Sequence, residues 1–155
     1  MSRARSLLLR TNYLAVMDYH FETAIPSLKL GLQAAIQYLS HVLIDVASST
    51  ITRLSTNVAI TNEDHYVIMD ILSELNHHAH RFAWYGDVHL WDRGFITNTK
   101  KEKCLEYTWH LDRLRGTTDE AQRLMVNGDL IEACTIMQVD LQRLLCRLYI
   151  LMDEL

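Results

Sequence analysis

Two pairs of residues in the sequence have a spacing that could serve metal chemistry. Glu74 and His78 lie four positions apart, and so do Glu106 and His110. On a helix this spacing puts both side chains on one face, so two such helices packed together could present carboxylates and imidazoles to one metal ion. Dinuclear metal bundles, however, space glutamate and histidine by three and add further glutamates. We therefore interpret these histidines as exposed or interfacial, and we expect no metal site and no cofactor.

Nucleophilic chemistry has less support. The sequence contains no GxSxG motif and no glycine-rich phosphate loop. Its cysteines, Cys104, Cys134 and Cys146, are odd in number and lack CxxC spacing, which is typical of reduced thiols in a cytosolic protein. Cys134 and Cys146 fall on the predicted apolar face of the last helix, where we expect inert thiols.

An irregular segment, WYGDVHLWDRGFITN (residues 84–98), interrupts the helical pattern and gathers the residue types that dominate interface energies. These are Trp84, Tyr85, Trp91, Arg93 and Phe95. We interpret them as a binding surface for a protein partner, in which the guanidinium of Arg93 could stack on Trp91 or Trp84 and still offer donors to a carboxylate or phosphate. The alternative is that the aromatic rings only plug one end of the fold.

A basic cluster follows this segment and gives a nucleic-acid alternative. Its members are Lys100, Lys101, Lys103, Arg113 and Arg115. Beside stacking aromatic rings, such residues could bind RNA without chemistry. The whole chain has a net charge of −4 and a pI of about 6.0, so it has no overall field for nucleic acid, and an ordinary solvated surface is the other interpretation.

Helices must position all of these residues. The chain has 155 residues, 49% of them hydrophobic, with one proline and five glycines, too few turn formers for a β-rich protein. We predict an all-α protein, a single helical bundle of five to six helices over residues 1–155. Apolar residues recur every three to four positions over residues 5–22, 27–55, 62–84, 99–115 and 130–152.

Several boundaries within this pattern can be predicted. Asn62 is a candidate N-cap, and Gly116 interrupts the fourth helix, so that a new start at Thr117 is as favoured as a continuous helix. The sequence Asn127-Gly128-Asp129 predicts a turn that ends in a cap. Asp45 falls in an apolar run, where the edge of the buried stripe is its usual place.

The same pattern bears on location. We find no apolar run near the roughly 18 residues that a membrane span needs, and no signal-peptide core at the N-terminus. We therefore predict a soluble, cytoplasmic protein that does not bind a membrane.

One family resemblance rests on two apolar helices. The run LQAAIQYLSHVLIDVASSTITRL, followed by NEDHYVIMDILSEL, resembles the HepT-like branch of the HEPN helical domains. Ile44-Asp45-Val46-Ala47 is similar to the first signature of that branch, and residues 65–72 are similar to the second, with Met69 at its aromatic position. The resemblance covers roughly residues 31–115 and puts the motif arginine on or near Arg93.

If the resemblance is one of ancestry, it implies a metal-independent ribonuclease that cleaves RNA through its 2′-hydroxyl, usually across a dimer. Asn98, however, stands where the family has its catalytic histidine, Gly94 follows the arginine, and Lys100 replaces a frequent tyrosine. An asparagine amide cannot shuttle a proton near neutral pH. Arg93 and His89 are therefore the candidate catalytic residues, with His77, His78 or His80 as other sources of the histidine. An inactive relative is the alternative to a ribonuclease toxin.

The leading interpretation is thus an interaction protein that associates with itself, most simply as a twofold homodimer, and with a protein partner through residues 84–98. A HEPN-like enzyme is the second hypothesis, and an RNA-binding accessory protein is the third.

Overall fold

The longest apolar run of the chain forms helix α2, Ile25–Ser55. Its buried hydrophobic side chains recur every three or four residues, as the 3.6-residue helical period requires. They are Leu28, Leu32, Ala35, Ile36, Leu39, Val42, Leu43, Val46 and Ala47. Asp45 is exposed beside this stripe, which confirms its predicted place at the edge.

The structure is a computed structural model that describes residues 25–87 and 98–155. Within these ranges there are helices and no strands, which confirms the predicted all-α helical bundle. After α2 come α3 (Asn62–Tyr85), α4 (Asn98–Asn127), α5 (Leu130–Gln138) and α6 (Asp140–Glu154). The helix predicted for residues 5–22 lies outside the described residues.

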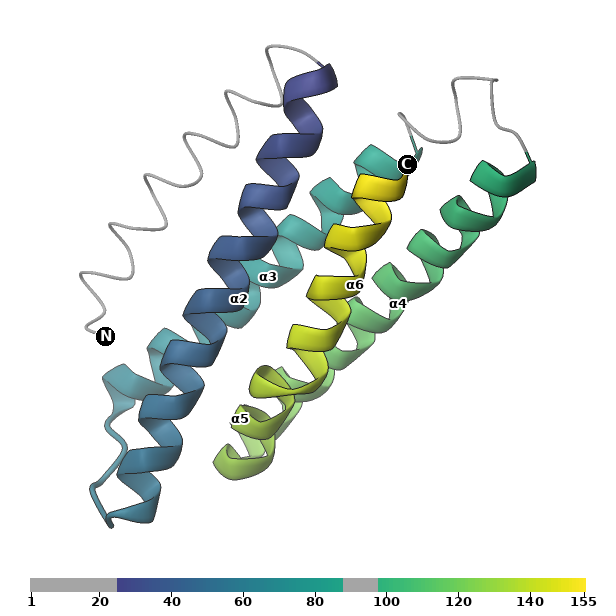
Figure 1. Ribbon diagram of the computed structural model, residues 1–155. Coiled ribbons are helices and arrows are strands. Elements are labelled where there is room, and N and C mark those ends of the chain that lie inside the picture. The colour runs from purple at the N-terminus through teal and green to yellow at the C-terminus, as the bar shows by residue number, and fades with distance from the viewer. Residues whose placement is uncertain (1–24, 88–97) are drawn as a thin grey trace.

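The helices form an up-and-down bundle with four arms (Figure 1). The arms are α2, α3, α4, and α5 together with α6. α3 packs against α2 and α4, and the arm of α5 and α6 closes the bundle by packing against α4 on one side and α2 on the other. Each arm therefore has a neighbouring arm on two sides, and its apolar face points to a shared core.

The start of α3 is fixed by a capping box. Thr61, rather than the predicted Asn62, is the N-cap: its side chain accepts a hydrogen bond from the backbone N–H of Asp64, and the Asp64 carboxylate accepts one from the backbone N–H of Thr61. Arg53 at the end of α2 forms an ion pair with Asp64, 2.5 Å long. Burial raises the pKa of Asp64, but the hydrogen bonds from Thr61 and Arg53 outweigh it and lower that pKa.

Helix α4 runs through Gly116 without a break, so of the two predicted alternatives the continuous helix is the correct one. The apolar stripe continues on both sides of the glycine, with Leu114 and Ala121 buried. Thr118 is buried as well, and its hydroxyl donates to the Leu114 carbonyl at 2.7 Å. Packing on the buried face therefore outweighs the roughly 1 kcal/mol that a glycine costs in a helix interior.

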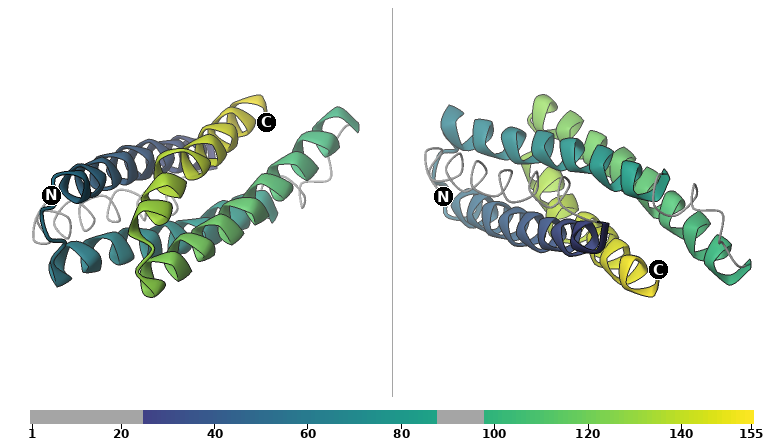
Figure 2. Two further views of the ribbon diagram at one scale, coloured as in Figure 1. Left: turned by 90° about the horizontal axis from the view of Figure 1, so that it is seen from below. Right: turned by 90° about the horizontal axis from the view of Figure 1, so that it is seen from above.

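The last predicted helix is interrupted at Val139, contrary to the prediction of one helix over residues 130–152. The side-chain amide of Gln142 donates to the Met137 carbonyl at 3.1 Å, so a side chain satisfies an acceptor at the break. Figure 2 shows α5 turned away from the line of α6. Before α5, Gly128 has a φ of 85° in the predicted turn, but Asp129 makes no side-chain cap.

Residues 28–55 of α2 are long and apolar enough to cross a membrane by length and composition alone. The expectation that no run comes near this length was therefore wrong. More than half of the 18-residue apolar stretch within this segment is buried inside the structure. This is the ordinary pattern of a core helix.

Candidate functional site

The predicted aromatic surface lies only partly within the described residues. His89, Trp91, Arg93 and Phe95 are outside them. Trp84, near the end of α3, is exposed over 43% of its surface, whereas Tyr85 is only 6% exposed. Tyr85 was predicted as a binding residue, but it belongs to the core.

Tyr85 packs against Tyr107 of α4, with their ring centroids 6.3 Å apart. The Tyr107 hydroxyl donates to the Phe82 carbonyl at 2.8 Å, and burial holds the pKa of Tyr107 well above its usual value. For Tyr85, the alternative interpretation of a ring that plugs the fold is therefore the correct one.

Three of the predicted basic residues of α4 contact different neighbours. Lys103 forms an ion pair with Glu154 of α6, 2.7 Å long, while Arg115 turns toward α3 and donates to the Ala79 carbonyl at 3.4 Å. Arg113 lies over the ring of Trp109, with 4.8 Å between its guanidinium carbon and the ring centroid. The nucleic-acid interpretation of the basic cluster stays a prediction.

The two glutamate–histidine pairs also have different environments. Glu74 and His78 are both buried in α3, with 3.8 Å between the carboxylate oxygen and Nε2. The expectation of an exposed or interfacial histidine is therefore wrong for His78. Glu106 instead binds Arg147 of α6, and Nδ1 of His110 contacts the Glu106 backbone carbonyl. Among residues 25–87 and 98–155, no three or more metal-ligating side chains are arranged to hold an ion.

The cysteines differ in exposure. Cys104 and Cys134 are buried, and burial raises the pKa of the Cys134 thiol to about 11, so that thiol stays protonated near neutral pH. Cys146 is exposed, which corrects its predicted place on the apolar face of the last helix.

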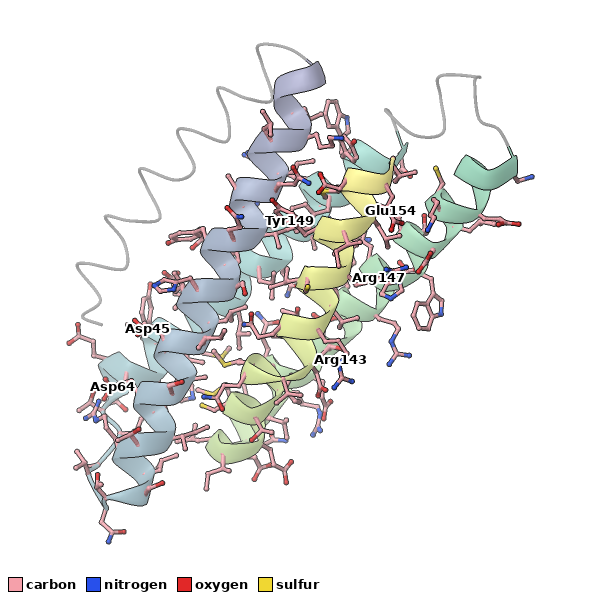
Figure 3. All side chains as sticks on the ribbon, in the orientation of Figure 1. Asp45, Asp64, Arg143, Arg147, Tyr149 and Glu154 are labelled. Carbon is pink, nitrogen blue, oxygen red and sulfur yellow. The ribbon has the colours of Figure 1, made fainter. Side chains whose placement is uncertain are left out.

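A groove of about 530 Å³ lies between α4 and α6, and it is the candidate site. α4 contributes residues three and four apart, which share the helix face turned toward α6. Figure 3 shows Arg143 and Arg147 extending from α6 on its α4 side. The groove is lined by Trp109, His110, Arg113, Thr117, Asp140, Arg143, Leu144 and Arg147; we call it the arginine groove.

One end of the arginine groove is fixed by an ion pair. Nε of Arg147 donates to Oε1 of Glu106 at 3.1 Å, and a second nitrogen of the same guanidinium contacts that oxygen. The hydrogen bond and the positive charge of Arg147 lower the pKa of Glu106, and Glu106 raises the pKa of Arg147. The pair therefore stays charged at neutral pH.

The rest of the arginine groove offers positive charge and a flat ring to solvent. Trp109 is 54% exposed, and the ring of His110 meets its ring edge-on at a centroid distance of 4.7 Å. Within the described part of the chain, neither Arg113 nor Arg143 forms an ion pair, and Asp140 has no basic partner. These guanidiniums can therefore bind carboxylates or phosphates of a ligand without first breaking a bond in this region.

Sequence reasoning named Arg113 of this groove as a binding residue and weighed His110 only as a metal ligand, and it missed the binding role of the other lining residues. Trp109 and Arg113, like Arg143 and Arg147, are four residues apart, so each pair occupies one helix face. This spacing places an arginine-bearing polar face on each of the two helices. It does not say that the two faces meet, which depends on the arm of α5 and α6 closing against α4.

No protein-family model, curated protein or solved structure matches this chain. The resemblance to the HEPN-like domains stays a prediction, because its motif arginine, Arg93, and its nearby histidine, His89, lie outside the described residues.

Proposed function

We propose that the chain is a protein-interaction module that binds an acidic segment of a partner protein in the arginine groove. The observation that carries this proposal is the position of Arg113 and Arg143, which have no ion-pair partner among the described residues and lie beside an exposed tryptophan. Tryptophan and arginine are the residue types most enriched among those that dominate binding at interfaces.

The lining also indicates what the partner segment presents. Carboxylates of the segment would bind the guanidiniums of Arg113 and Arg143, which can form paired hydrogen bonds to a carboxylate. An apolar side chain between them would pack on Leu144 and on the ring of Trp109. The preferred ligand is thus a short segment with acidic residues on both sides of a leucine or an aromatic residue.

The mixed charge of the groove favours such a protein segment over RNA. Asp140 lines the groove, and the carboxylate of Glu106 already occupies Arg147. A phosphate backbone would meet both carboxylates, and the net charge of −4 for the whole chain gives no field that attracts nucleic acid. A protein segment can avoid these carboxylates by placing its own acidic residues unevenly.

The test is a titration with fluorescently labelled peptides in which two glutamates flank one leucine or phenylalanine at different spacings. We expect Arg143→Gln to weaken the best of these peptides about tenfold, which corresponds to about 1.4 kcal/mol. The matched control is Lys101→Gln, which removes a positive charge from an exposed position of α4 outside the groove.

The same titration identifies the results that would overturn the proposal. These are no binding by any of the peptides, or an equal loss of affinity in Lys101→Gln and Arg143→Gln. Tighter binding of a mixed-sequence single-stranded RNA, weakened by Arg143→Gln, would instead make the groove a nucleic-acid site.

A further inference from the structure

The outward face of α4 carries a second regular pattern, which shares Trp109 with the arginine groove. Exposed residues follow one another at alternating spacings of three and four along this helix. They are Glu102, Leu105, Trp109, Asp112, Gly116, Asp119 and Arg123; we call them the α4 seam. Alternation of three and four is the heptad spacing by which one helix packs along another. Asn76 of α3 reaches the seam from one side and donates to Asp119 at 3.3 Å, and Arg147 of α6 binds Glu106 on the other side.

Two members of the α4 seam are large apolar residues. A third, Gly116, has no side chain and leaves a notch in the surface. Leu105 and Trp109 are each 54% exposed. Gly116 lies two turns beyond Trp109, and a Cβ atom at this position would meet no atom within 4 Å. The bundle itself therefore gives no steric reason for a glycine here, whereas a bulky side chain from outside would fit against it.

Charges along the seam select the direction of a second helix. In a parallel pair of α4 helices, each residue would face its own copy, so that Glu102, Asp112 and Asp119 would each meet a like charge. An antiparallel pair with its twofold axis between Asp112 and Arg113 places Asp112 opposite Arg113 of the second copy. The same register places Glu102 opposite Arg123, and Trp109 opposite Gly116. Asp119 then lies opposite Glu106, a like charge that Arg147 already binds. The register thus joins opposite charges at Asp112 and Glu102 and a ring over a notch, with one like-charge contact.

We infer that the α4 seam is the surface on which this chain pairs with a second copy of itself, antiparallel and in this register. Such a twofold contact is self-complementary, as an isologous interface must be. The pairing goes beyond binding in the arginine groove, because Glu102, Gly116 and Arg123 do not line that groove. It also covers Trp109 and Arg113, which do line the groove, so a dimer and a groove-bound segment compete for these two residues.

Charge reversal tests the register directly, with analytical ultracentrifugation of the full chain over micromolar concentrations as the readout. We expect the wild-type chain to form a dimer. Glu102→Arg alone puts arginine opposite arginine, and Arg123→Glu alone puts glutamate opposite glutamate, so each variant should raise the dimer Kd at least tenfold. In an equimolar mixture both contacts join opposite charges, and dimers should return as mixed pairs. Asp45→Arg, on the exposed face of α2, is the control and should stay dimeric.

A second variant tests the notch without changing charge. Gly116→Leu adds a side chain where the structure has open space, so the single chain should keep its helical circular dichroism and its thermal midpoint while the dimer is lost. A wild-type chain that stays monomeric, a mixture that does not recover dimers, or a dimer that Gly116→Leu leaves intact would each overturn the inference.

Discussion

Helix α6 is held to its two neighbours by different chemistry. On its α2 side the donors are side-chain amides: Gln142 donates to the Ser40 carbonyl at 3.1 Å, and Gln33 donates to the Asp153 carboxylate at 2.8 Å. On its α4 side the contacts are the ion pairs of Arg147 with Glu106 and of Glu154 with Lys103. Figure 3 shows Tyr149 on the side toward α2, and Arg143 and Arg147 on the side toward α4.

The two sides also differ in the charge of the donors that join the helices, which are amides on the α2 side and cations on the α4 side. Uncharged amides can be buried between two helices once each polar atom has a partner. Arginine instead keeps its charged end in water on a long stem. The α4 side holds the arginine groove of about 530 Å³, whose lining includes Arg143 and Arg147 of α6.

The largest effect on stability is expected from a core residue of α6, which supports both the α2 side and the α4 side. Leu148 is fully buried on the core face of α6. Leu148→Ala should lower the free energy of unfolding by about 2–5 kcal/mol, because it leaves a cavity and the surrounding side chains lose their packing contacts with Leu148. Urea denaturation measures the change. Ile150→Ala, at a 40% exposed position of the same helix, is the control and should cost far less; equal costs would mean that α6 is not packed as described.

An intermediate effect is expected when the α2 side is broken. Gln142→Ala removes the amide that donates to the Ser40 and Met137 carbonyls. Each of these two hydrogen bonds contributes about 0.5–1.5 kcal/mol net, so their loss together should cost about 1–3 kcal/mol, which thermal or urea unfolding can detect. Gln37→Ala, exposed on α2, should be nearly neutral. A neutral Gln142→Ala would show that water replaces the amide and that the two sides of α6 do not differ in this respect.

The smallest effect is expected on the α4 side, and it depends on pH. Arg147 lowers the pKa of Glu106 from its ordinary 4.5. A carboxyl group whose pKa is lower in the folded chain stabilises the fold fully above its unfolded value, and this contribution disappears as the pH falls through the lowered pKa. Because both side chains are about one third exposed, the contribution is about 1 kcal/mol or less.

Comparing Glu106→Gln with the wild type in urea measures this contribution. The variant should be less stable than the wild type at neutral pH, and this difference should vanish as the pH falls through the lowered pKa of Glu106. Asp45→Asn is the control, because Asp45 is exposed and forms no ion pair with a described residue. A stability difference that persists at low pH would assign the effect to packing rather than to charge.

Much of the bundle could be predicted because apolar periodicity is a local property. The limits of α2 and α3 agree with the sequence prediction to within two residues. The break at Val139 could not be predicted, because it accompanies a hydrogen bond from Gln142 to the Met137 carbonyl, and the residue types alone do not specify that bond. The sequence left a continuous α4 and a new start at Thr117 equally favoured, because the choice depends on burial of Leu114, Thr118 and Ala121.

The candidate site was harder to predict than the fold. Arg113 was singled out from its charge, but Arg143 and Arg147 fall some thirty residues later and reach the same groove only through packing of α6 on α4. Tyr85 belongs to an aromatic cluster in the sequence, yet its ring turns inward to Tyr107. Sequence spacing places residues on helix faces, and it does not say which faces meet.

The order of the arms around the bundle has a consequence for how the chain folds. α2 meets α3, and α3 meets α4, between neighbours along the chain, whereas Gln33 and Asp153 are joined across 120 residues. Contacts between near residues cost little loop entropy and form early, and those between distant residues form late. Packing of α6 on α2 is therefore the last step of folding. Gln142→Ala should act mainly by speeding unfolding, while the folding rate stays nearly the same.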